Sequence, residues 1–183
     1  ISFLCSDDKN KLIGGKFKKN YLISNFFNVL ILDKKSGDSG EILETNVLKN
    51  NLYKIKKNEK RASTGLLHLK ISKNYNFVFI NSVLKTKRYF DDGISKNILY
   101  FKSISPNYSV EYEKLLLSYK KLPMLIRLRC YININRFYLH GANRINLSNI
   151  DSVFIYIFYI FALIIYFRDT MKLKTKFINY KKK

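Results

Sequence analysis

The N-terminal half of the chain consists of short apolar runs separated by polar segments rich in Gly, Asn, Asp and Ser. Runs of this length that alternate, or that hold many aromatic and β-branched residues, are typical of strands. Strands are therefore predicted for four segments, the second of which fits a short helix equally well: residues 26–32, 41–55, 66–71 and 75–84. Residues 1–20 carry scattered lysines and a Gly14-Gly15 pair, which predicts a loose basic arm. Residues 1–85 are thus expected to form a small sheet-containing extension.

The apolar pattern becomes helical after Pro106. Four residues at i, i+3, i+4 and i+7 place one apolar stripe on a predicted helix: Tyr112, Leu115, Leu116 and Tyr119. Ser109 is expected to cap the start of this helix, and Pro123 ends it. Core packing is the expected use of the stripe.

A run of fifteen uncharged residues, 153–167, lies before a basic C-terminal tail. As a helix it would be ~22 Å long at ~1.5 Å per residue, short for the ~30 Å core of a bilayer. Two uses stay open for it, burial among neighbouring protein or RNA and insertion into a membrane. The predicted fold is α+β with extended, irregular RNA-binding segments. In it, the N-terminal extension is followed, over residues 86–183, by a helix, a basic loop and the apolar segment.

The net charge of the chain indicates a binding function in addition to a fold. Thirty-four Lys and Arg residues against 13 Asp and Glu give a net charge of +21 and a pI near 9.9. So large a charge of one sign calls for a polyanionic partner, either nucleic acid or an anionic membrane surface. Aromatic residues make up 15% of the chain, so it has apolar surface to bury and is not merely a hydrophilic tail.

Arginine is concentrated in residues 122–150, which hold four of the seven in the chain and no Lys, Asp or Glu. These four are Arg127, Arg129, Arg136 and Arg144. The high Lys, Asn and Ile content suggests an AT-rich gene, in which arginine persists where the planar guanidinium matters, as in contacts to phosphates and base edges. Asparagines and aromatic residues lie between these arginines, a composition suited to irregular RNA. A solvated basic loop is the alternative interpretation.

The order of motifs around this stretch suggests a family. Residues 115–121 precede Leu122-Pro123, and Arg127-Leu128-Arg129-Cys130 follows. Further along come Asn133 and Arg136, then His140-Gly141, Arg144 and finally Leu147-Ser148. Over residues 99–150 this order resembles ribosomal protein fourteen of the small subunit, in its bacterial and mitochondrial form without zinc. The chain departs from the family pattern in a longer segment before Gly141, a missing turn glycine, and Asn149 in place of an arginine.

The resemblance implies a structural role in the head of the small ribosomal subunit. It implies binding to small-subunit rRNA and to neighbouring head proteins, which in the family are ribosomal proteins three, ten and nineteen. It places a turn at Asn133 and Arg136 and a basic loop around Arg144. The residues expected to contact RNA are Arg127, Arg129, Asn133, Arg136, His140, Arg144 and Ser148, with Lys172, Lys174 and Lys176 of the tail.

Catalysis, metal and cofactor binding are not expected. The two cysteines, Cys5 and Cys130, are far apart and form no Cys-x-x-Cys pair, so a zinc ribbon is excluded, and Cys130 is expected to be a small buried residue. Residues 37–40, Gly-Asp-Ser-Gly, match the nucleophile segment of trypsin-like proteases. Both histidines of the chain lie downstream of it, whereas that family has its histidine upstream, so residues 37–40 are interpreted as a hairpin turn.

Residue usage and the first residues predict an organellar protein. Residues 1–10 resemble neither a secretory signal nor an Arg-rich presequence, which favours synthesis inside the organelle. The expected location is the ribosome of the mitochondrial matrix. The alternative function is a single-pass membrane subunit of an organellar respiratory complex, in which residues 153–167 cross the bilayer.

Overall fold

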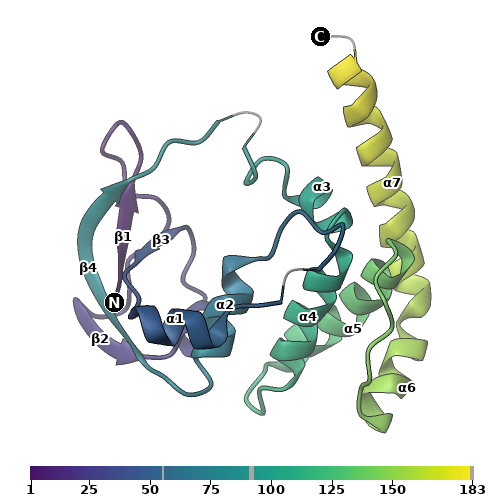
Figure 1. The fold of residues 1–183 in the computed structure, drawn as a ribbon, viewed down its shortest axis with the longest axis horizontal. Helices are drawn as coiled ribbons and strands as arrows, with labels where there is room; N and C mark the ends of the chain where they lie inside the picture. The colour runs from purple at the N-terminus through teal and green to yellow at the C-terminus, as the bar shows by residue number, and fades with distance from the viewer. Residues whose placement is uncertain (55, 91–92, 182–183) are drawn as a thin grey trace. The chain divides into compact units, whose positions relative to one another are not determined.

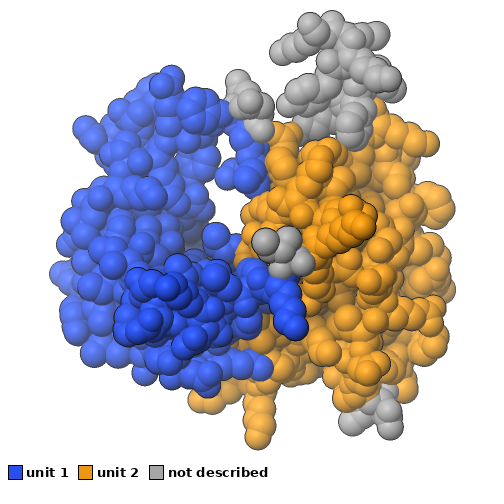
Figure 2. Space-filling model, viewed as in Figure 1, with its two compact units in different colours: residues 1–54, 64–96 blue, residues 55–63, 97–183 orange. Residues whose placement is uncertain are grey.

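The computed structural model describes all residues except 55, 91–92 and 182–183, and it does not describe the side chains of 149–150 and 175–183. It divides into two compact units (Figure 2). Unit 1 comprises residues 1–54 and 64–96, and unit 2 comprises residues 55–63 and 97–183. Each unit is described by itself below.

Unit 1 is organised around a four-stranded sheet with the order β2-β4-β1-β3 (Figure 1). The strands are β1 (Ser2–Ser6), β2 (Tyr21–Ser24), β3 (Ser39–Glu41) and β4 (Phe77–Thr86). β4 pairs antiparallel with β2 and parallel with β1, and β1 pairs antiparallel with β3. The strand predicted over residues 75–84 is confirmed as β4.

The prediction of a loose basic arm over residues 1–20 is wrong, because this segment contains β1 and every residue of β1 is buried. Gly14 is not a flexible point either. It adopts a left-handed φ of +77°, and a Cβ there would lie 2.4 Å from the Cα of Gly37. The loops that carry these two glycines therefore pack against each other at a distance that a side chain would block.

Two other segments predicted as strands are helical. Residues 26–32 contain the π-helix η1 (Phe27–Leu32), and residues 66–71 lie in α2 (Thr64–Ile71). Short apolar runs have no periodicity that distinguishes a buried strand from a buried helix, and here tertiary packing decides. The segment 41–55, open between strand and helix, contributes only the end of β3 and the short helix α1 (Thr45–Asn51).

The core of unit 1 is aromatic. Phe26 meets Phe77 edge to face, with ring centroids 4.5 Å apart, and stacks against the His68 ring at 4.2 Å. Such pairs are favourable beyond the area they bury. The rest of this core consists of Leu4, Phe17, Val29, Ile71 and Phe79.

Unit 2 is helical, with α3 (Ile98–Ser103), α4 (Pro106–Leu117), α5 (Met124–Leu139), α6 (Asn149–Ile157) and α7 (Tyr159–Lys181). Helix α5 packs against α4, α6 and α7 (Figure 1). Ser109 is not the N-cap of α4, because the helix begins three residues earlier at Pro106. Of the predicted apolar stripe only Leu116 is buried, and the inward face holds Tyr108, Val110, Glu113 and Leu117 as well.

The extended, irregular RNA-binding segments expected within residues 86–183 are mostly helical, although a loop does carry Arg144. Helix α5 runs without a break through the turn expected at Asn133 and Arg136. Cys130, Tyr131, Ile134 and Phe137 are buried along one side of it, with the spacing of a helix. Within residues 122–150 the non-helical backbone comprises residues 122–123, the turn at 140–141 and the loop 142–148. The α+β class is confirmed, but most of the segments predicted to be extended are helical.

The apolar run 153–167 occupies α6 and α7, and its inner side packs on α5 where Phe154 stacks on Tyr131. Its outer side is exposed, and carries Val153, Ile157, Ile160, Phe161, Ile164 and Phe167. Among the described residues no single helix has the length and apolar character to cross a membrane. Residues 151–157 and 159–174 reach that length and composition only together, as a pair bent by 59°.

Candidate nucleic-acid interface

Three of the expected RNA contacts lie on one face of α5, and His140, the residue that follows the helix, continues that face. Arg129, Asn133, Arg136 and His140 follow each other at i, i+4, i+7 and i+11, which aligns their side chains along the helix. A polar face on a helix with a buried opposite side would suit a nucleic-acid backbone if it were open to solvent. The contacts below show that much of it is not.

Arg136 and His140 are joined to a buried acid of α7. Arg136 Nε donates a hydrogen bond to Oδ2 of Asp169, and His140 Nε2 lies 3.5 Å from the same oxygen. Asp169 is 1% exposed. Burial lowers the pKa of His140 even though Asp169 favours the imidazolium form. These two side chains therefore fix α5 to α7.

Asn133 likewise joins α5 to a buried acid, in this case one on α4. Its Nδ2 donates to Oε1 of Glu113 at 2.9 Å, and Glu113 is 2% exposed. Burial raises the pKa of Glu113, while the Cys130 thiol and the positive charge of Lys102 act to lower it. Burial also raises the pKa of Cys130, so this cysteine is buried as expected and the thiolate is disfavoured.

Arg127 caps the C-terminal end of α4. Its two terminal nitrogens donate to the carbonyl oxygens of Leu117 at 3.3 Å and Tyr119 at 3.4 Å. The last carbonyls of a helix lack intrahelical partners and carry partial negative charge, so a guanidinium is favourable there. The arginine is thus bonded to carbonyls of its own unit.

Ser148 is the N-cap of α6, where its hydroxyl accepts from the backbone N–H of Asp151 at 3.1 Å. Asp151 also accepts from the hydroxyl of Tyr131 at 2.7 Å, which holds the start of α6 against α5. The family resemblance places the start of the last helix at Leu147-Ser148, whereas in the structure Ser148 begins α6 and α7 follows it. The side chain of Ser148 is occupied in that role.

The remaining expected contacts are exposed. Arg129 lies on α5, Arg144 in the loop 142–148, and Lys172 and Lys174 on α7. Lys176 belongs to the same helix, but its side chain lies outside those that the structure describes. The structure therefore gathers Asn133, Arg136 and His140 into internal contacts and leaves these cations at the surface.

The acidic side chains, in contrast, are mostly paired within their own unit. Asp91 and Asp92 lie outside the described residues, and nine of the other eleven acids hydrogen-bond or pair with a group of the chain. They are Asp7, Asp33, Asp38, Glu41, Glu59, Glu111, Glu113, Asp151 and Asp169. Most of the described acids are thereby engaged within the protein, while the chain keeps a large excess of positive charge.

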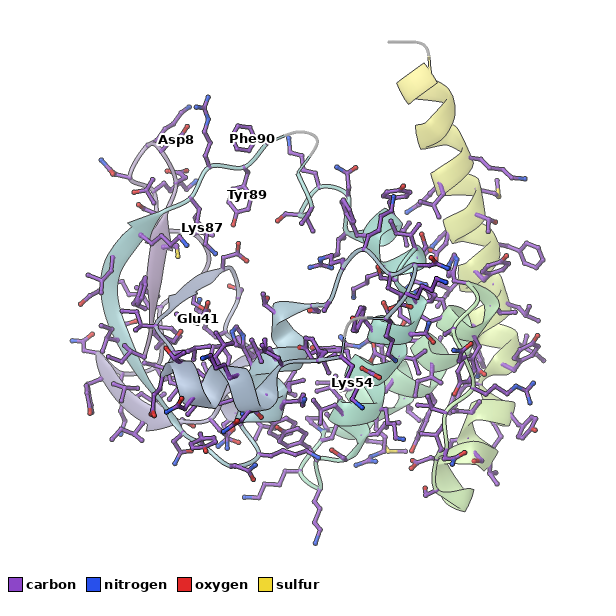
Figure 3. The ribbon with its side chains drawn as sticks, in the orientation of Figure 1. Asp8, Glu41, Lys54, Lys87, Tyr89 and Phe90 are labelled. Atoms are coloured by element: carbon purple, nitrogen blue, oxygen red, sulfur yellow. The ribbon has the colours of Figure 1, made fainter. Side chains whose placement is uncertain are left out.

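One such pairing in unit 1 involves Lys87 and Tyr89, which Figure 3 labels. Lys87 Nζ lies 3.2 Å from Oδ2 of Asp38, and the Tyr89 hydroxyl donates to the same oxygen at 2.7 Å. Burial and this hydrogen bond raise the pKa of Tyr89 to about 12. The segment that follows β4 is thus fastened to the loop before β3.

Sequence reasoning missed the two buried acids, Glu113 and Asp169. A signal was present for each, because Glu113 lies three residues from both Val110 and Leu116 on α4, and Asp169 lies seven residues after the buried Ala162 on α7. Those spacings place both acids on inward faces of their helices. An acid on such a face calls for a cationic or amide partner.

No protein-family model, curated protein or solved structure matches this chain.

Proposed function

We propose that this protein is a structural constituent of the small subunit of an organellar ribosome, the mitochondrial one, in which it binds rRNA and neighbouring proteins. The observation that carries the proposal is the separation of charge described above. Nine acids have partners within their own units, while the chain carries a net charge of +21. A surface of this sign is suited to a polyanion.

The ordered motifs of residues 99–150 support the ribosome as the particular setting. By that resemblance the rRNA is that of the small-subunit head, and the neighbouring proteins are ribosomal proteins three, ten and nineteen. The exposed apolar side of α6 and α7 is suited to a neighbouring protein, because apolar side chains there are solvated in the isolated chain.

The proposed RNA contacts are the exposed cations Arg129, Arg144, Lys172 and Lys174. Lysines supply salt-sensitive attraction to phosphates, and the arginines add planar donors that fix orientation. Arg127, Arg136 and His140 act indirectly, because their bonds to α4 and α7 position the helix that carries Arg129.

Co-sedimentation with ribosomal subunits tests the proposal. The native protein should remain with the small subunit in high salt, and the purified chain should bind small-subunit rRNA with a steep salt dependence. Arg129→Gln combined with Arg144→Gln should weaken rRNA binding several-fold and reduce the salt slope by about two. Lys49→Gln with Lys114→Gln removes the same charge from exposed lysines of α1 and α4, and should weaken binding less. A native protein absent from the small subunit would contradict the proposal.

A second candidate function is that of a membrane subunit of an organellar respiratory complex. The exposed apolar side of α6 and α7 favours it, together with the bent helix pair whose length and composition suit a bilayer. Alkaline carbonate extraction separates the two functions. Release into the soluble fraction favours the ribosome, and retention in the membrane favours the respiratory complex.

A further inference from the structure

A cavity of about 640 Å³ lies within unit 2, between the C-terminal part of α5, the loop 142–147, α6 and the start of α7. We propose that this cavity takes one unpaired base of a single-stranded RNA segment, with tyrosine rings against the base and Arg144 at the adjoining phosphate. The inference rests on the proposed RNA binding and names the part of the RNA that this site receives.

Two tyrosines supply stacking surfaces. Tyr156 in α6 and Tyr159 at the start of α7 both line the cavity, and they are 78% and 43% exposed. Their rings are thus accessible, whereas Tyr131 in the same unit is buried and already stacked on Phe154. Single-stranded RNA is commonly recognised by stacking splayed bases on exposed aromatic rings.

Arg144 gives the cavity its charge. It lines the cavity, is exposed, and is the only charged residue among the lining residues that the structure describes. A guanidinium without a carboxylate beside it can direct its planar donors to a phosphate. The combination of rings, a single arginine and no acid fits a nucleotide better than it fits a cationic or a purely apolar ligand.

The polar groups of the cavity wall are already engaged within the protein. Asn135 Nδ2 donates to the carbonyl oxygen of Ile155 at 2.6 Å, and the Ser152 hydroxyl donates to that of Ser148 at 3.0 Å. The Tyr138 hydroxyl accepts from the backbone N–H of Ile145 at 3.3 Å, which ties the loop to α5. The wall is therefore held in place and has few donors left for base edges. The site should accept a base by stacking, with little sequence preference.

The size of the cavity agrees with this assignment. Its volume falls within the range of about 300–1,000 Å³ that is typical of small-molecule sites. Such a space holds one base with its ribose and is too small for a stretch of duplex. An RNA loop or a single-stranded junction is therefore the form of RNA that reaches it.

The test compares two ten-nucleotide probes on the full chain, oligouridylate RNA and the same backbone with abasic sites. Both carry the same phosphates, so their difference reports base contacts alone. The intact chain should bind oligouridylate about tenfold more tightly. Tyr156→Ala with Tyr159→Ala should abolish that difference. The matched control Phe161→Ala with Phe167→Ala, which removes two exposed rings outside the cavity lining, should preserve it.

Equal binding of the two probes by the intact chain would overturn the cavity assignment and leave RNA binding in place. Failure of both probes to bind would overturn the proposed function itself. A photo-cross-link from 4-thiouridine RNA to the intact chain provides a second measurement that requires no variant. Cross-links at Tyr156 or Tyr159 support the assignment, and cross-links only to other residues overturn it.

Discussion

Arg136 of α5 donates from Nε to Oδ2 of Asp169 in α7, and Asp169 is 1% exposed. Asp169 is thus the internal partner of Arg136, which the sequence analysis expected to contact RNA. A buried charge that loses its partner is costly, because nothing else in the interior replaces the lost solvation. This pair therefore connects the stability of the helical unit to the residues of its basic face.

Asp169→Asn should destabilise the protein by about 3 kcal/mol, the low end for a buried pair that loses one partner, because the Arg136 side chain is still 16% exposed. Urea denaturation measures the loss. The exposed Asp8→Asn is the matched control and should have a small effect. Replacing both partners, by Arg136→Met with Asp169→Leu, should cost less than the single change. Equal stability of the Asp169 and Asp8 variants would show that the pair contributes nothing.

Stability should fall as the pH falls below about 6.5, the usual pKa of histidine. Burial lowers the pKa of both His68 and His140 in the folded protein. The unfolded chain then binds more protons than the folded one below pH 6.5, so the folded state is stabilised above that pH and loses this stabilisation below it. The contribution of these two histidines to the free energy of unfolding should therefore be higher at pH 7.5 than at pH 5.5. His68→Gln with His140→Gln should flatten this difference, and an unchanged slope would contradict the assignment to these two groups.

Glu113→Gln should become relatively more stable than the natural sequence as the pH rises. Burial raises the pKa of Glu113, so the folded protein holds a proton on this carboxyl that the unfolded chain releases above pH 4.5. That contribution to stability is complete at low pH and is lost as the pH rises through the folded pKa. Unfolding free energies at pH 5 and pH 8 measure the trend. Glu44→Gln on α1 is the matched control and should show no comparable trend.

Ile160→Lys with Ile164→Lys should leave the stability nearly unchanged, because the two side chains are 67% and 63% exposed. The same change should reduce self-association, since it interrupts the apolar side of α7. Analytical ultracentrifugation and urea denaturation measure the two effects. Ala162→Lys, on the buried side of the same helix, should instead destabilise the protein strongly. A large loss of stability in the Ile160 and Ile164 variant would show that this side is packed.

The sequence predicts the elements whose periodicity is strong. β4 and α4 were expected close to their observed positions, and Ser148 begins α6 as its motif suggests. The segments containing η1 and α2 were expected to be strands, because runs of about six apolar residues fit both periods. The pairing of β1 with β4 was missed because it depends on residues distant in sequence.

For several residues of the candidate site, the structure shows internal contacts that the sequence analysis did not predict. Charge and motif order singled out Arg127, Arg136 and His140, but their partners lie on other helices. Two of those partners are backbone carbonyls, which have no sequence signature at all. Arg144 and Arg129 remain exposed, as a contact to a large ligand requires. Exposure distinguishes the residues that we propose to bind RNA from those that pack within the unit, and it depends on the tertiary fold.

The central position of β1 limits how unit 1 can be divided or produced. Ser2 pairs with Phe79, so ribosomal synthesis makes the whole intervening polypeptide before this part of the sheet can close. In a nascent chain the apolar residues of β1 stay exposed until β4 has been synthesised. A chaperone is expected to bind this stretch during that interval. A shortened product that stops before β4 lacks the strand joining β1 to β2, and is expected to aggregate.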